Sequence, residues 1–148
     1  MSLNNCITKT LGCLTIMACA LGSTSKQADA QEIRWLKSAE QAALQAEKTG
    51  KPILVYVRSE SCHYCDKLQH DVWEFPQAAS YVAKKYIPLK LSKELNPAAV
   101  ESLKIKGYPT TLVFSPQREF VAKVEGYMPA GALFAKISQS ESTTAAVR

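Results

Sequence analysis

Two cysteines separated by two residues, Cys62 and Cys65, have the clearest capacity for chemistry in this sequence. Pairs with this spacing occur in zinc sites, in structural cross-links and in redox-active disulfides. A structural zinc ion takes four ligands, and after Ala30 the chain offers no second cysteine pair, with His63 and His70 as its histidines. A bridge between residues three apart closes a very short loop and removes little entropy from the unfolded chain. The sequence therefore favours a redox pair and no metal ion.

The first thirty residues have the layout of a secretory signal peptide. A lysine precedes an apolar run over residues 10–22, and the small-x-small triplet ADA follows at 28–30. The apolar run is well below the roughly 20 residues that span a bilayer, which disfavours a membrane anchor. We therefore predict cleavage after Ala30, export to the periplasm and no membrane span in the mature protein. A lipid anchor on Cys19 is the alternative interpretation.

Cleavage would change the number of cysteines and the net charge of the protein. Three of the five cysteines would leave with the signal peptide, so the pair would have no competing thiol in an oxidising compartment. Residues 31–148 carry 16 Lys and Arg against 12 Asp and Glu, and no basic block is longer than two lysines. This scattered excess indicates a solvated surface and disfavours nucleic-acid binding.

The segments around the pair predict alternating helices and strands. Ser38 is a candidate N-cap for a helix over 38–49, which Gly50 ends. The apolar run at 52–58 is typical of a buried central strand. The pattern further predicts helices at 63–72, 76–85, 97–103 and 129–139, and strands at 86–92, 110–114 and 119–126. This order indicates an α/β fold with a central mixed sheet and helices on both faces.

Prolines limit where these elements can lie. Pro88 has no N–H for a strand ladder, so its strand should lie near a sheet edge or place that residue where no hydrogen bond is needed. Pro97 suits the first position of a helix that Asn96 caps. Pro116 suits the second position of a tight turn, which predicts a hairpin from the last two strands. The polar segment 139–148 is expected to be frayed.

Two motifs in this pattern resemble those of thioredoxin-fold proteins. The stretch KPILVYVRSESCHYC places the cysteine pair after a strand, and about forty residues later GYPTT places Gly-x-Pro-Thr before the hairpin. A Trp and a Lys-Pro before the first long strand resemble exported thioredoxin-like domains in particular. The similarity covers nearly all of residues 35–138. It implies a thioredoxin-like domain at 31–138, between the signal peptide (1–30) and the polar tail (139–148).

The resemblance implies a thiol–disulfide oxidoreductase whose cysteines are the redox centre, without a bound cofactor. At a helix start, N–H groups and the helix dipole stabilise a thiolate, so Cys62 is the expected nucleophile. Cys65, one turn further in, is the expected resolving thiol. His63 and Tyr64 lie between them and are expected to tune the thiolate, since a protonated histidine would favour the anion.

Three further positions follow from the resemblance. Pro109 stands at the place of the family's cis-proline, whose loop faces the disulfide and pairs with a bound partner's backbone. Tyr108 would border the active site, although an ordinary trans proline and a packed aromatic are the alternatives. Many thioredoxins carry a buried acid six residues before the first cysteine, where this chain has Tyr56. Glu60 belongs to the turn and is expected to be solvated, so the proton acceptor for Cys65 stays open.

The expected partners are protein thiols or disulfides of the cell envelope, a membrane redox protein among them. The alternative hypothesis is a thioredoxin-fold module that binds peptides and holds an incidental or structural disulfide. The direction of electron flow also stays open, because related proteins span about −270 to −120 mV.

Overall fold

The structure, a computed structural model, describes residues 32–146. The predicted signal peptide, its cleavage site and Cys19 lie outside the described residues. The helices are α1 (Ala39–Thr49), α2 (His63–Leu68), α3 (Pro76–Lys85), α4 (Pro97–Ser102) and α5 (Ala130–Ala146), with a π-helical segment η1 (Gln69–Trp73) after α2. The strands are β1 (Ile53–Arg58), β2 (Ile87–Ser92), β3 (Thr110–Phe114) and β4 (Phe120–Glu125).

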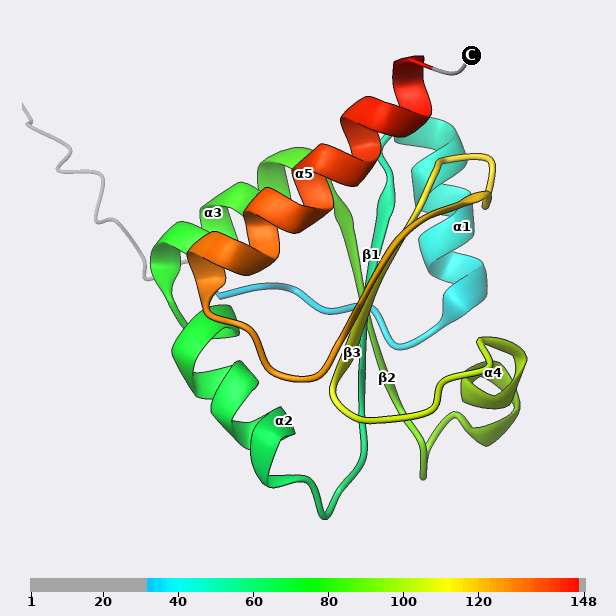
Figure 1. The fold of residues 1–148 in the computed structure, drawn as a ribbon. Helices are drawn as coiled ribbons and strands as arrows, with labels where there is room; N and C mark the ends of the chain where they lie inside the picture. Colours follow the sequence, from blue (N-terminus) through cyan, green and yellow to red (C-terminus); the bar gives the residue numbers. More distant parts are fainter. Residues whose placement is uncertain (1–31, 147–148) are drawn as a thin grey trace, which may run out of the picture.

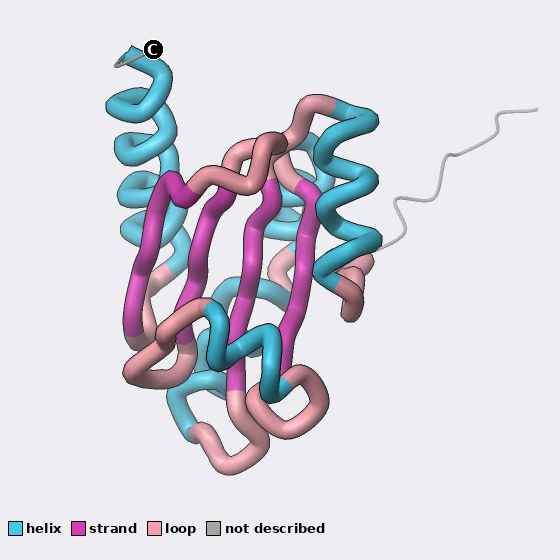
Figure 2. Tube along the Cα trace, turned by 90° about the vertical axis from the view of Figure 1, so that its right-hand side faces the viewer, coloured by secondary structure: helices cyan, strands magenta, loops and turns pink. Residues whose placement is uncertain are grey.

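The four strands form one mixed sheet in the order β2-β1-β3-β4 (Figure 2). Strand β1 runs parallel to β2 and antiparallel to β3, which pairs with β4 in a hairpin. Helices α2, α3 and α5 lie on one side of the sheet, and α1 and α4 lie on the other (Figure 1). The predicted α/β fold with helices on both faces is therefore confirmed.

The sheet edges agree with the proline positions. Pro88 lies in β2, an edge strand, and its carbonyl accepts a hydrogen bond of 2.9 Å from the Leu36 N–H. The turn between β3 and β4 closes through a bond of 2.9 Å from the Arg118 N–H to the Ser115 carbonyl, which places Pro116 second in the turn. Both predictions are confirmed.

The core has two halves because β1 is buried on both faces. Leu54 and Tyr56 point towards α2, α3 and α5, whereas Val55 and Val57 point towards α1 and α4. Fully burying an aliphatic side chain of this kind contributes about 1.5–3 kcal/mol. The apolar run that marked β1 as a central strand thus holds both layers of helices to the sheet.

Local capping rules set the ends of α1. The Ser38 side chain accepts a hydrogen bond of 3.3 Å from the Gln41 N–H. Gly50 ends the helix with φ 69°, a left-handed conformation that glycine adopts without a steric penalty. Asn96 lies at the predicted position directly before α4. Its side chain does not cap the helix, however, but accepts a hydrogen bond of 3.2 Å from the Ser92 N–H.

Two helices differ from the sequence expectation. The helix predicted over 63–72 changes to a π turn at Gln69, where the Glu74 N–H bonds to the Gln69 carbonyl at 3.0 Å. This segment buries two consecutive side chains, Val72 and Trp73. Helix α5 continues through Ala146, so the predicted end of the last helix at residue 139 is wrong.

Candidate active site

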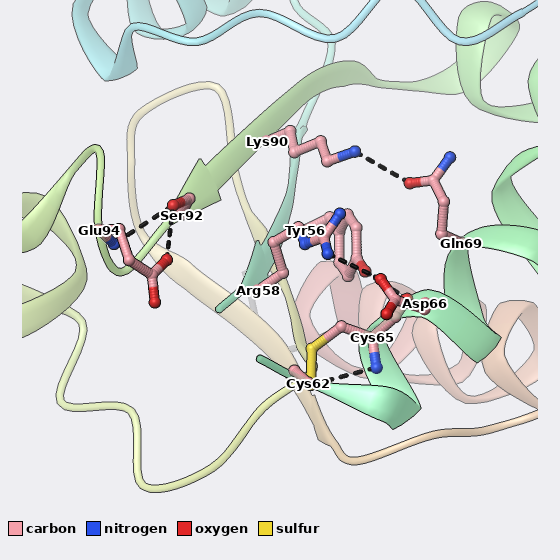
Figure 3. A network of polar contacts seen from close by, with 9 residues as sticks. All are labelled: Tyr56, Arg58, Cys62, Cys65, Asp66, Gln69, Lys90, Ser92 and Glu94. Carbon is pink, nitrogen blue, oxygen red and sulfur yellow. Dashed lines mark hydrogen bonds and ion pairs between the residues drawn. A yellow bond between two sulfur atoms is a disulfide. The ribbon is translucent and has the colours of Figure 1, made fainter. Parts of the chain in front are cut away.

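Cys62 and Cys65 form a disulfide at the start of α2, with their Cα atoms 5.2 Å apart. Strand β1 ends at Arg58, and residues 59–61 lead from it to Cys62. Figure 3 shows the bonded pair at the start of α2. Cys62 is partly exposed, whereas Cys65 is fully buried. One sulfur is therefore open to a partner, and the other lies in the interior behind it.

The backbone at the helix start points its donors at Cys62. The Cys65 N–H donates to Cys62 Sγ at 3.1 Å, and the Asp66 N–H donates to the Cys62 carbonyl at 3.1 Å. An N–H group in this position favours a negative charge on the sulfur once the disulfide is reduced. The geometry thus suits the roles expected of Cys62 as nucleophile and Cys65 as resolving thiol, which stay predictions.

Tyr56 lies beneath the disulfide on β1. Its side chain is fully buried, and its hydroxyl donates to the Cys65 carbonyl at 2.9 Å. The rings of Trp35 and Trp73 lie 5.8 and 5.7 Å from the Tyr56 ring and hold it in place. Burial raises the pKa of Tyr56 to about 12, while the Arg58 charge acts to lower it. At neutral pH Tyr56 is therefore an uncharged donor and does not replace the carboxylate base.

The loop before β3 lies at the same end of the sheet as the cysteine pair. Val57, near the end of β1, is paired with Thr110 at the start of β3, so Pro109 lies beside the loop that leads to Cys62. The Tyr108–Pro109 peptide bond is cis, and Pro109 is buried. Tyr108 is half-buried and packs against the core under α1 and α4, in agreement with the packed-aromatic alternative.

The sequence matches the thioredoxin-like domain over residues 39–141. The chain belongs to this family. A comparison with curated proteins finds no match.

Solved structures support the same fold for this thioredoxin-like domain. The oxidoreductase DsbH is 13% identical with a TM-score of 0.66, over 74% of this chain and 84% of that one. A thioredoxin from Thermus thermophilus is 20% identical with a TM-score of 0.65, over 73% and 86% of the chains. A putative disulphide-isomerase from Bacteroides thetaiotaomicron is 24% identical with a TM-score of 0.65, over 76% and 96%. At these identities the likeness shows the fold alone.

The two residues between the cysteines of this thioredoxin-like domain lie on its surface. His63 and Tyr64 are exposed, Tyr64 to 58%, and their ring centroids lie 5.6 Å apart. Neither side chain packs into the core. Both are therefore available to a partner that reaches Cys62.

Two absences hold for the part of the chain that the structure describes. Within residues 32–146, no three His, Cys, Asp or Glu side chains gather closely enough to hold a metal ion. No helix in that range combines the length and apolar character that crossing a membrane requires.

Three polar side chains around the thioredoxin-like disulfide have contacts that the sequence analysis missed. The sequence presents Tyr56 only as a departure from an acid and does not predict its bond to the Cys65 carbonyl. Arg58 donates to Asp66 at 2.8 Å and joins the end of β1 to α2. Lys90 donates to Gln69 at 3.0 Å from β2 (Figure 3). The cysteine spacing points to the helix but not to these contacts.

The site therefore has the parts that thiol–disulfide exchange requires. It combines an accessible sulfur at a helix start with a buried sulfur bonded to it and backbone donors for the thiolate. A disulfide and a thiolate exchange through attack on one sulfur and departure of the other. Only the cysteines change covalently in such a reaction.

Proposed function

We propose that this protein is an exported, periplasmic thiol–disulfide oxidoreductase that exchanges the Cys62–Cys65 disulfide with partner proteins. The observation that carries the proposal is the unequal burial of the two bonded sulfurs at the start of α2. The family match and the fold shared with a structure named as an oxidoreductase also support it.

The exchange passes through a mixed disulfide. When the protein acts as oxidant, a partner thiolate attacks Cys62 Sγ, the Cys62–Cys65 bond breaks, and Cys65 departs as a thiolate that takes up a proton. A second partner thiol then loses its proton and attacks the partner's sulfur bound to Cys62. This step forms the partner disulfide and releases Cys62 as a thiolate, so two electrons have moved to the protein. The reverse sequence reduces a partner disulfide.

Residues around Cys62 would receive the partner. We assign this role to His63, Tyr64 and the loop at Tyr108 and Pro109, because they lie beside the exposed sulfur or at the same end of the sheet. The partners would be protein thiols or disulfides of the cell envelope, with a membrane redox protein to regenerate the pair. The signal-like first thirty residues support this location.

A trapping experiment tests the function. Cys65→Ala leaves the nucleophile but removes the resolving thiol, so partners should accumulate as mixed disulfides on Cys62. Cys62→Ala is the matched control, because it retains one buried thiol and should trap only background. The adducts are detected on non-reducing gels and identified after reduction. If Cys65→Ala traps nothing while both variants still bind partners, the protein is a binding module instead.

A further inference from the structure

A pocket lies at the carboxyl ends of β1 and β2, and its lining reaches Glu60, two residues before Cys62. We call it the basic pocket, and its volume is about 540 Å³. The residues that matter for its chemistry are Trp35, Lys37, Arg58, Glu60, Lys90 and Leu95. A volume of this size lies in the range of ligand-binding sites. Neither cysteine lines the pocket, so it is a neighbour of the redox centre and not part of it.

The charge of the basic pocket is mainly positive. Three cations line it, against the single carboxylate of Glu60. Lys90 and Arg58 come from neighbouring strands, and their side chains point towards Gln69 of η1 and Asp66 of α2 (Figure 3). Arg58 has Asp66 as an ion-pair partner, whereas Lys90 donates to the neutral amide of Gln69. The three cations that line the pocket thus outnumber Glu60 and Asp66, the carboxylates beside them.

Lys90 is a cation whose charged form is disfavoured by its surroundings. Burial lowers the pKa of Lys90, and the nearby charges of Arg58 and Lys37 lower it further, while Glu74 acts in the opposite direction. Like charges held together in a partly desolvated site repel one another. A carboxylate that entered the pocket would relieve this repulsion and would supply the charged partner that Gln69 does not.

Apolar surface borders the same pocket. Leu95 is 76% exposed, and Trp35 is half-buried. An aliphatic or aromatic side chain placed next to the carboxylate could therefore pack on both residues. This pairing of apolar surface with positive charge fits an acidic polypeptide segment.

We propose that the basic pocket binds an acidic segment of the partner protein, with a carboxylate at Lys90 and Arg58 and an apolar neighbour on Trp35 and Leu95. The proposal rests on the proposed function and names its substrate class: proteins whose reactive cysteine lies close to an acidic residue. Glu60 of the pocket precedes Cys62 by two residues, so their Cα atoms are at most about 7 Å apart. A polypeptide can span that distance within about two to four residues.

Paired peptides provide the test. Two sets of disulfide-bonded peptides carry either Glu or Gln at two, three or four residues on each side of the reactive cysteine, and are otherwise identical. The full chain should exchange with the best Glu peptide with a kcat/KM about tenfold higher than with its Gln twin at low salt, because a charge-assisted hydrogen bond is lost in the twin. The preference should fall as ionic strength rises.

Matched variants test which residues cause the preference for Glu peptides over Gln peptides. Lys90→Gln should bring the ratio of kcat/KM values close to one, and Lys37→Gln, at an exposed position, should lower it partly. Lys84→Gln removes the same charge from an exposed position on α3 and should keep the ratio. The ratio compares two substrates of one variant, so a changed redox potential does not affect it. If Lys90→Gln does not fold, the ratio measured for Lys37→Gln tests the proposal, and an unchanged ratio there would contradict it.

The possible failures are distinguishable. Equal kcat/KM values for every Glu and Gln pair in the unmodified protein would overturn the acidic-segment proposal and leave the proposed function intact. An equal loss of preference in Lys84→Gln and Lys90→Gln would also overturn it, because net charge and not the pocket would then be responsible. Absence of exchange with all the peptides would contradict the proposed function itself.

Discussion

The first turn of α2 has an exposed end and a buried end, and the two are built differently. Cys62 is partly exposed, and His63 and Tyr64 beside it extend into solvent. Cys65 is fully buried, and its carbonyl accepts the hydroxyl hydrogen of Tyr56. The exposed end keeps a sulfur accessible, and the buried end holds that sulfur in position. Substitutions at the two ends should therefore affect different properties.

The largest effect on stability should come from the interior. Trp73 is 2% exposed and contacts the rings of Trp35, Tyr56 and Phe134. Trp73→Ala would leave a cavity beneath the active-site helix and should lower the free energy of unfolding by about 3–5 kcal/mol. Tyr64→Ala, at the exposed end, should change it by about 0.5 kcal/mol or less. Chemical denaturation measures both, and similar losses would break the comparison.

The two thiols of the reduced protein should also differ clearly in their rates of alkylation. Cys62 has solvent access and a backbone N–H donor, whereas Cys65 is enclosed. Cys62 should therefore be alkylated first, about tenfold faster or more. Iodoacetamide labelling followed by peptide mass spectrometry gives both rates. Equal rates would mean that burial in the oxidised state does not carry over to the reduced one.

Tyr56→Phe should have a moderate effect, because the ring is kept and one hydrogen bond is removed. The loss should be about 1 kcal/mol in the free energy of unfolding. The Cys65 carbonyl retains the N–H of Gln69 as a donor.

The same variant changes the response to alkaline pH. Tyr56 has a pKa of about 12 in the folded protein against an ordinary value of 10.0. Folding favours the neutral hydroxyl of Tyr56. The stability that this hydroxyl contributes is therefore complete below pH 10 and is lost as the pH rises towards 12. The difference in stability between the unmodified protein and Tyr56→Phe should shrink over this window. Denaturation curves at pH 8, 10 and 11.5 test this, and a constant difference would contradict the assignment.

The smallest effect on stability should come from His63→Gln, since the side chain is exposed and its ring lies beside that of Tyr64. The free energy of unfolding should stay within about 0.5 kcal/mol. The exchange rate with a model disulfide should fall modestly, because the imidazole ring beside the reactive sulfur is lost. Stopped-flow kinetics measures the rate, with Lys84→Gln as a surface control. A large loss of stability would show that the exposed end has a structural role.

Most of the secondary structure could be predicted, because its signals are local. Ser38 and Gly50 mark the ends of α1, and the apolar run before Arg58 marks β1. The cysteine spacing with the Gly-x-Pro-Thr motif also sufficed for the fold class. The π turn at Gln69 and the helical residues after 139 were not predicted, because polar and apolar spacing alone does not distinguish them from regular or frayed helix.

The sequence by itself determined the position of the redox pair at a helix start and the burial of β1 on both faces. It also determined that the strand with Pro88 lies at an edge and that Pro116 lies in the turn between β3 and β4. Each of these depends on residues that are neighbours along the chain. Only the tertiary structure decided that Tyr56 supports Cys65 and that Lys90 joins Arg58 in one pocket. Burial, pKa and local charge depend on which distant segments pack together, and Lys90 reaches Gln69 of η1 from a position 21 residues further along the chain.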